Sequence, residues 1–417
     1  MLGLFALLIA CGTSNPNGND GGNNDGGNNN DGGNNNDGSS GGFSCSQGTL
    51  YAGDPVYAGD PNLRPTSGTA IKADPPLVWQ TLVIAGTHLY TRQESEVWSV
   101  DMSAASPVET KIAGTTPSGS TYDFNAGPCS SANFTQLRGL AAMSDGSLVA
   151  SDYWANAIVK ISNPDNPGTC SVSVVVGTAG PLTGVDPSDS NTLPPAGNAN
   201  GKGAAGSFNG PQALTVDGSG NIFVVDHRVS DDATLIRRID PSGFASTLAT
   251  LGTTSGAPTD ISNLTNLNGT IYAAARDDVN NSYVIAIDLQ GNITTVLGGD
   301  SDKFPPVPSG NDPAVSGITN DDKNLIIAGD GYVWYLTLTG QLTQIAGGTE
   351  NSIDFFTNGY DPTQPHPAMQ LQLPTAIGSA DEDGTGSFNH IVYSNGALYY
   401  RGFADGSSAF IEKIACQ

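Results

Sequence analysis

Short apolar and β-branched runs, separated by turn-forming residues, dominate the chain after residue 42. Residues 206–252 show the pattern best, with the successive runs ALTV, NIFVV, LIRRI and FASTLA. The intervening GSG and PSG favour tight hairpins, because glycine tolerates positive φ and proline pre-sets the first turn angle. A longer loop, residues 226–234, separates the second run from the third. The pattern predicts a four-stranded antiparallel sheet that must stack on copies of itself to bury both faces.

Such copies recur along the chain. The fourth run returns as TKIAG, VVVG, TTVLGG and TQIAGG. The first hairpin returns as QLRGLAAMSDGSLVASD, LTNLNGTIYAA and SGITNDDKNLIIAGD, and in more divergent form as WQTLVIAGTHLYT and HIVYSNGALYY. A repeat of about fifty residues with four strands per copy predicts an all-β fold, a β-propeller.

Residues 206–252 resemble an NHL repeat. The residues that show this are FN-x-P at 208–211, the Val-Asp-x-x-Gly-Asn turn at 216–221, Val-Asp at 225–226, and Arg-Arg-Ile-Asp-Pro at 237–241. A fair match also covers residues 136–177, and the resemblance extends over nearly everything after residue 42. It implies an NHL-like propeller over residues 43–417.

The repeats predict six blades and a closing seam. The last copy ends in AFIEKIACQ, which matches a third strand and lacks a fourth, whereas GTLYAGD at residues 48–54 is a fourth strand without a blade. An N-terminal strand therefore completes the last blade and removes the free sheet edges. Cys45 precedes one of these strands and Cys416 ends the other, so a disulfide between them would replace the missing hairpin turn.

The first eleven residues are typical of a bacterial lipoprotein signal. Residues 2–10 are apolar, and LIAC has the spacing of a lipoprotein cleavage site with Cys11 as the acylated N-terminus, although no Lys or Arg precedes the apolar run. Residues 12–42 are rich in Gly, Asn and Asp, which predicts a disordered tether. We expect a lipid-anchored protein of a bacterial cell envelope, at the outer membrane or cell surface, whose only membrane contact is that anchor.

Export makes disulfides possible. Five cysteines occur, and the four other than Cys11 form an even set. Cys129 lies in the loop before one repeat and Cys170 in the turn before the fourth strand of that repeat, which predicts a second disulfide. The formal net charge of −25, from 15 Lys and Arg against 40 Asp and Glu, excludes nucleic acid as a partner and disfavours anionic lipid headgroups.

One face of the predicted propeller holds the candidate binding residues. Loops between blades and loops between second and third strands open on the same face, here called the loop-rich face, and such faces usually bind ligands. The candidate ligand-binding residues there are Tyr153, Trp154, Asp226, His227, Arg228, Arg276, Arg401 and His390. Tyr153 and Trp154 are the best candidates, since large aromatics give contact area at low entropy cost; packing of Trp154 against the next blade is the alternative.

Catalytic roles find less support in the sequence. Asp152 and Asp226 follow second strands, where capping of the next loop is the favoured role. His227, His366 and His390 are weak candidates for a zinc site, because nothing in their spacing requires convergence. Calcium is equally weak as a cofactor, since the expected inner strands carry amides and hydroxyls instead of glutamates. Neither a Gly-x-Ser-x-Gly elbow nor a Walker loop occurs in residues 43–417.

The sequence thus predicts a non-catalytic, envelope-tethered propeller without a cofactor that binds a protein or other extracellular ligand on its loop-rich face. Two alternatives stay open. One is a secreted propeller lyase or hydrolase with a metal at the channel mouth, and the other is a module that binds envelope polysaccharide.

Overall fold

The computed structural model describes residues 43–53, 81–104, 109–115, 120–178, 180–231, 233–252, 257–277, 281–299, 315–329, 331–347, 365–371, 373, 391–404 and 408–417. The expected signal with Cys11, the expected tether at 12–42, and His390 lie outside these residues. The predictions made for them stay predictions.

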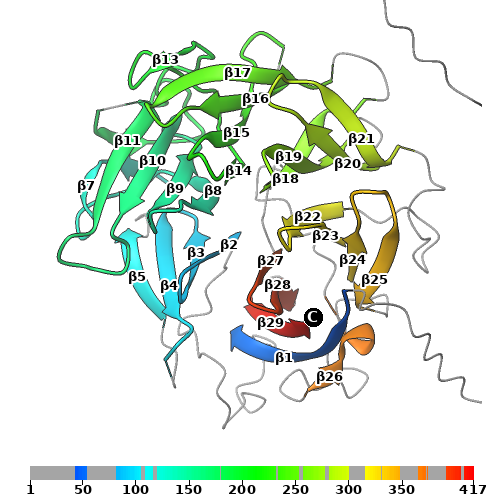
Figure 1. The fold of residues 1–417 in the computed structure, drawn as a ribbon. Coiled ribbons are helices and arrows are strands. Elements are labelled where there is room, and N and C mark those ends of the chain that lie inside the picture. The colour runs from blue at the N-terminus through cyan, green and yellow to red at the C-terminus, as the bar shows by residue number, and fades with distance from the viewer. Residues whose placement is uncertain are drawn as a thin grey trace, which may run out of the picture. The chain divides into compact units, whose positions relative to one another are not determined.

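Six antiparallel sheets of four or more strands make up the described chain, and we number these blades 1 to 6 by the order of their inner strands (Figure 1). Blade 1 consists of β2 (Thr81–Ala85), β3 (His88–Gln93), β4 (Glu96–Asp101) and β5 (Glu109–Gly114). Blade 2 consists of β8 (Leu137–Ala142), β9 (Leu148–Asp152), β10 (Ala157–Ser162) and β11 (Ser171–Gly177). Blade 3 consists of β14 (Leu214–Val216), β15 (Ile222–His227), β16 (Thr234–Ile239) and β17 (Phe244–Thr250).

The remaining three blades follow the same order. Blade 4 consists of β18 (Asp260–Leu267), β19 (Thr270–Arg276), β20 (Ser282–Ile287) and β21 (Ile293–Gly298). Blade 5 consists of β22 (Val315–Asn320), β23 (Leu325–Gly329), β24 (Tyr332–Leu336) and β25 (Leu342–Ala346). Blade 6 consists of β27 (Ile391–Ser394), β28 (Ala397–Ala404), β29 (Ser408–Cys416) and β1 (Cys45–Gly53).

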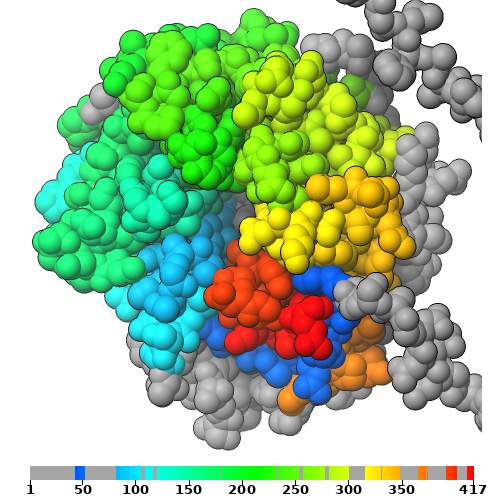
Figure 2. Space-filling model, in the orientation of Figure 1, coloured from blue at the N-terminus to red at the C-terminus, as the bar shows by residue number. Residues whose placement is uncertain are grey.

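The inner strands close a ring. Strand β2 contacts β8, which contacts β14, and the series continues through β18, β22 and β27 back to β2. Figure 2 shows the surface of blade 6, with β27 to β29 in red and β1 in blue, between those of blade 1 and blade 5. Apolar side chains fill the space between neighbouring blades, as where Val83 and Val97 of blade 1 pack in one cluster with Leu137 and Leu148 of blade 2. The predicted six-bladed propeller is confirmed.

The seam forms as the sequence predicted. Strand β1 pairs antiparallel with β29, with Cys45 opposite Cys416, and a disulfide joins these two residues. Beyond it, the N–H of Ser44 donates to the carbonyl of Gln417 at 2.9 Å, and the reverse bond has the same length. The N-terminal strand therefore completes blade 6, and the disulfide takes the place of the hairpin turn between third and fourth strands.

A repeated irregularity explains the glycine at the end of the fourth runs. In blades 1 to 5 the pairing of third and fourth strands shifts register once, at Val97/Trp98, Ile158/Val159, Ile236/Arg237, Val284/Ile285 and Val333/Trp334. Past the shift, the chain passes close to the loop before the third strand. Gly177 has φ +105°, and a Cβ there would overlap the carbonyl of Asn156. Only glycine combines this φ with so close an approach.

The long segments between blades do not all open on the loop-rich face, as the sequence had led us to expect. Strands β7 (Gly127–Pro128), β13 (Gly201–Lys202) and β26 (His366–Pro367) lie along the outer strands β11, β17 and β1. Each belongs to the segment that precedes its blade. The chain therefore first pairs with the outer strand of that blade and then forms its inner strand. The reason is that an uncovered outer strand leaves a row of unpaired N–H and C=O groups.

Three further short elements belong to these segments. Strand β6 (Tyr122–Phe124) pairs with β12 (Leu182–Val185), and the 3₁₀ turn η1 (Ala368–Gln370) follows β26. Across the residues described, no helix has the length and apolar character needed to cross a membrane.

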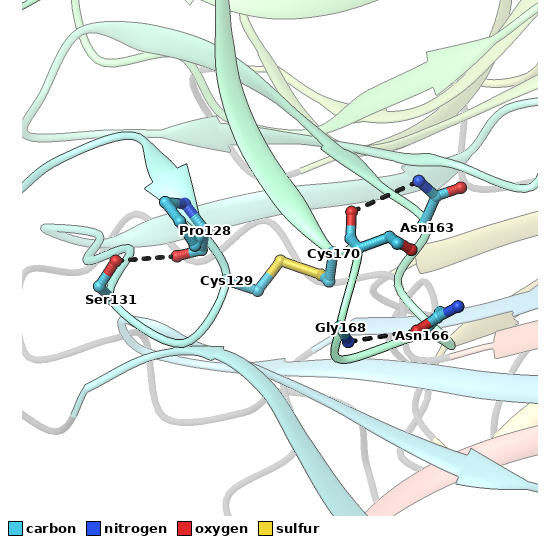
Figure 3. Close-up of a disulfide and its surroundings, with 8 residues drawn as sticks. Pro128, Cys129, Ser131, Asn163, Asn166, Gly168 and Cys170 are labelled. Carbon is cyan, nitrogen blue, oxygen red and sulfur yellow. Dashed lines mark hydrogen bonds between the residues drawn. A yellow bond between two sulfur atoms is a disulfide. The ribbon is translucent and has the colours of Figure 1, made fainter.

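The second disulfide depends on β7. Cys129 follows β7 and Cys170 precedes β11, and the pairing of Pro128 with Ser171 brings their Cα atoms to 5.3 Å (Figure 3). The N–H of Cys129 also donates to the carbonyl of Cys170 at 3.1 Å. The predicted Cys129–Cys170 disulfide is confirmed. Cys129 precedes the first strand of blade 2 and Cys170 precedes the fourth. The two residues are nevertheless close in space, because β7 pairs with the fourth strand of the same blade.

Blade 6 also buries a carboxyl group beside the seam. Glu412 of β29 is fully buried next to Gly48 and Leu371, and neither of its oxygens has a hydrogen-bond partner among the residues described. Burial raises the pKa of Glu412 to about 8. The group is therefore held mainly in its neutral form in the folded protein below that pH.

Glu412→Gln should stabilise the protein at alkaline pH. The contribution of Glu412 to stability is fully present below its unfolded pKa, near 4.5, and is lost as the pH rises through about 8. The glutamine has no charge to desolvate, so we expect a gain of about 2 kcal/mol at pH 8 after the cost of its buried amide, and no gain at pH 4. Thermal denaturation at both pH values measures the difference. A variant no more stable than the wild type at pH 8 would show that Glu412 ionises without penalty.

Candidate functional site

The loop-rich face carries a pocket of 320 Å³ between the loops of blades 2 and 3. Residues from three segments line it, and the principal ones are Tyr153, Trp154, Asn156, Leu193, Pro194 and Asn209. The first three lie in the loop between β9 and β10. Leu193 and Pro194 belong to the long segment that connects blade 2 to blade 3. The two aromatic residues favoured by the sequence therefore share one concave site.

Hydrogen bonds and packing hold the aromatic wall in place. The rings of Tyr153 and Trp154 meet edge to face, with centroids 4.5 Å apart and an interplanar angle of 81°. The N–H of Tyr153 donates to the carbonyl of Gln136 at 2.7 Å. The Tyr153 ring lies so close to Gly210 that a Cβ there would come within 2.7 Å of it. Perpendicular aromatic pairs are a favourable geometry, so the wall is preformed.

Asn156 fastens the opposite walls to each other. Its side-chain amide donates to the carbonyl of Pro194 at 3.3 Å, and its Oδ1 accepts from the N–H of Gly210 at 2.8 Å. Asn156 has φ +52°, a conformation that asparagine tolerates better than most residues. One buried side chain thus ties the segment before blade 3 to the aromatic loop of blade 2.

Asp152, the last residue of β9, anchors the loop between β9 and β10 by hydrogen bonds. Its carboxylate accepts from the backbone N–H groups of Thr135 at 2.9 Å and Gln136 at 3.1 Å, and also from the Thr135 hydroxyl. Burial raises the pKa of Asp152, while these hydrogen bonds lower it. The carboxylate also accepts from the N–H of Ala155 at 3.4 Å, and it thus caps the loop that bears Tyr153 and Trp154.

Asp226 occupies the same place in blade 3 but pairs with an arginine. Its carboxylate lies 3.0 Å from the Arg237 guanidinium, and both side chains are fully buried. It also accepts from the N–H of Asn209 at 2.8 Å and the amide of Asn198 at 3.0 Å. The Arg237 guanidinium in turn lies 5.1 Å from the Phe208 ring centroid. These contacts account for Phe208, Asn209, Asp226 and Arg237 of the NHL-like pattern.

These contacts give Asp226 a structural role, and its place among the candidate ligand-binding residues stays a prediction. A carboxylate that already binds a guanidinium and two further donors inside the protein has little left to offer a ligand. Burial raises the pKa of Asp226, and the Asn209 amide and the Arg237 charge oppose that rise.

His227 and Arg228 follow Asp226 on the loop-rich face. The Nε2 of His227 lies 2.9 Å from the side-chain nitrogen of Gln212, beside the inner strand of blade 3. The side chain of Arg228 is 38% exposed and forms a two-pronged ion pair with Asp231, at 2.6 and 2.5 Å. Both contacts are local. An exposed ion pair of this kind contributes little to stability.

The other candidates lie farther apart. Arg276 ends β19 in blade 4 and is half-buried. Arg401 lies in β28 of blade 6 and is buried, with 3% exposure. His366 lies in β26 at the outer edge of blade 6, opposite Gly48, whereas His227 belongs to blade 3. Within the described ranges, no group of three or more His, Cys, Asp or Glu side chains could hold a metal ion.

The sequence interpretation missed two buried arginines and most of the pocket wall. Arg92 of β3 and Arg138 of β8 are 1% and 0% exposed. The guanidinium of Arg138 lies 4.8 Å from the centroid of the Tyr153 ring. The available signal was the presence of arginine among apolar neighbours, in HLYTRQ and QLRGLAA. The pocket residues Leu193 and Pro194 gave no signal, because they lie in a segment without strand periodicity.

Comparisons with known proteins concern the fold. No family model matches the chain, and no curated protein matches it in sequence. Solved structures similar to it include a virginiamycin B lyase from Staphylococcus aureus, with 14% identity, 81% of this chain and 94% of that chain covered, and a TM-score of 0.43. A gluconolactonase from Xanthomonas campestris has 12% identity, coverage of 82% and 87%, and a TM-score of 0.45. A luciferin-regenerating enzyme has 10% identity, coverage of 82% and 92%, and a TM-score of 0.45. Likeness at this level gives no argument about a ligand or a reaction.

Proposed function

We propose that this propeller is a binding protein that takes a small ligand with an apolar ring face, such as a sugar, into the Tyr153–Trp154 pocket. The observation that carries the proposal is the preformed pocket, with two perpendicular aromatic rings held on the loop-rich face. Its volume of 320 Å³ lies at the lower end of the usual range for ligand pockets, about 300–1,000 Å³. A pocket of that size suits a small molecule better than a flat protein surface.

The surroundings of the pocket support binding without turnover. A catalytic acid or base must come within hydrogen-bond reach of the substrate. Of the carboxylates that follow the second strands of blades 2 and 3, Asp152 holds the Thr135–Gln136 backbone and Asp226 holds Arg237. The polar groups that do line the pocket include the Asn156 amide and Asn209, which suit the hydrogen-bonding hydroxyls of a sugar. The alternative, a lyase or hydrolase, would need another acid or base to reach this pocket.

Trp154→Ala should weaken ligand binding by more than about tenfold while leaving the fold intact. Truncation of a central aromatic contact typically weakens binding by more than about tenfold. Saturation-transfer NMR against a panel of mono- and disaccharides, followed by titration of the best sugar, measures this loss. The matched control is Phe244→Ala, because Phe244 is an exposed aromatic residue, 45% accessible, at a hairpin of blade 3 away from the pocket.

Three outcomes of that experiment would contradict the proposal. Binding of every sugar could be absent from the wild type, binding could be undiminished in Trp154→Ala, or binding could be weakened equally in Phe244→Ala. The same spectra also report turnover. A sugar consumed by the wild type would replace the binding role with the enzyme alternative.

A further inference from the structure

Three buried arginines gather where blades 6, 1 and 2 meet at the loop-rich end of the ring. Arg401 comes from the second strand of blade 6, Arg92 from the second strand of blade 1, and Arg138 from the inner strand of blade 2. These blades are consecutive, since β2 contacts both β27 and β8. None of the three side chains is more than 3% exposed.

Hydrogen bonds fix where the guanidinium groups of Arg92 and Arg138 lie. The Nε of Arg92 donates to the Thr81 hydroxyl at 3.2 Å, and its guanidinium also donates to the carbonyl of Leu137. The Arg92 head group thus reaches across the blade boundary to the residue next to Arg138. Arg138 in turn donates to the side-chain oxygen of Gln136 at 3.0 Å and lies over the Tyr153 ring.

The charges of the other two arginines act on Arg92. Burial lowers the pKa of Arg92 well below its usual value, and the charges of Arg138 and Arg401 lower it further, while Glu94 raises it. Glu94 lies in the exposed turn after β3. Burial also lowers the pKa of Arg401, to about 9. Such a grouping is unusual in a chain with only 15 Lys and Arg and a formal net charge of −25.

An anion placed among these groups would be stabilised by all three. Guanidinium groups present planar pairs of N–H donors that match the two oxygens of a carboxylate or two oxygens of a phosphate. In a buried site these charge-assisted bonds are strong, because water does not screen them. An anion would also offset the repulsion that the charges of Arg138 and Arg401 exert on Arg92.

We propose that Arg92, Arg138 and Arg401 bind an oxyanion, either a carboxylate or a phosphate, at the junction of blades 6, 1 and 2. This site is distinct from the Tyr153–Trp154 pocket, and the proposal stands without a sugar ligand there. Arg138 connects the two, since it stacks on the face of Tyr153, so a ligand with an acidic group could engage both.

Isothermal titration of the full-length protein with malonate and with inorganic phosphate tests the proposal. We expect the wild type to bind at least one of them at constant ionic strength, and to melt at a higher temperature in its presence than in sodium chloride of the same ionic strength. The oxyanion that binds more tightly identifies the class. Arg138→Gln and Arg401→Gln should each raise the dissociation constant at least tenfold.

Two control variants test whether anion binding depends on these three arginines. Arg238→Gln removes a half-buried arginine of blade 3 that bonds to Asn221, and it should bind the anion as the wild type does. Trp154→Ala should also keep anion binding, even where it loses the sugar. Equal melting of the wild type in malonate, phosphate and chloride would overturn the proposal, whatever the variants do. Unchanged affinity in a folded Arg401→Gln protein would overturn it as well.

Discussion

Replacing Cys45 and Cys416 together by serine should lower the free energy of unfolding by about 4–5 kcal/mol. The disulfide joins residues 371 positions apart, and the loop-closure entropy it removes from the unfolded chain grows with that separation. Strand β1 has no hairpin to hold it, so its release from β29 should accompany the loss. Denaturant titration gives the change in stability, and hydrogen exchange shows whether β1 and β29 open together.

The second disulfide supplies the control for this experiment. Cys129 and Cys170 are only 41 positions apart, so their replacement by serine should cost less and should loosen β7 and β11 instead of the seam. Exchange at residues 48–53 that is the same in wild type and seam variant would mean that β1 is held without the disulfide.

Arg237→Met should destabilise the protein by about 3–5 kcal/mol at neutral pH, because it leaves the Asp226 carboxylate buried without its partner. The deficit should shrink as the pH falls. Without the guanidinium the pKa of Asp226 is higher, so the stability it contributes is present at low pH and lost as the pH rises through that value. Thermal denaturation of wild type and variant at pH 4.5 and 7.5 measures both effects.

Two variants check the cause. Arg238→Met changes the adjacent, half-buried arginine and should cost about 1 kcal/mol or less. Adding Asp226→Asn to Arg237→Met removes the unpaired charge and should recover part of the lost stability. If the double variant is no more stable than Arg237→Met at pH 7.5, the buried charge is not the cause of the deficit.

The architecture could be predicted because its signals are local and repeated. Each hairpin has its own turn residues, and the fourth strands of blades 1, 2, 4 and 5 are followed or ended by a glycine, such as Gly177, that must pass close to a carbonyl. The seam could be predicted by counting the strands of each repeat. The last repeat lacks a fourth strand, and the N-terminal strand has no blade of its own, so the two were expected to pair. Once the two strands were paired, the positions of Cys45 and Cys416 at their ends were enough to predict the disulfide between them.

The candidate site could be predicted only in part, because it depends on segments without periodicity. Tyr153 and Trp154 stood out as large aromatics in a loop, but the opposite wall at Leu193 and Pro194 is defined only in three dimensions. The two-residue strand β26 is too short for a pattern, so the place of His366 at an outer edge could not be foreseen. The grouping of Arg92, Arg138 and Arg401 needs the ring to be closed before the three meet.

The seam also changes what proteolysis can do to this molecule. From Cys45 to Cys416 the chain is a covalent macrocycle, since the disulfide closes the path that the backbone opens. One cut in an exposed loop, such as the Arg228–Asp231 turn, therefore converts the cycle into a linear chain and releases no fragment. All six blades would stay in one covalently linked molecule until the disulfide is reduced or a second cut is made. A propeller of this kind can be nicked once and remain one molecule.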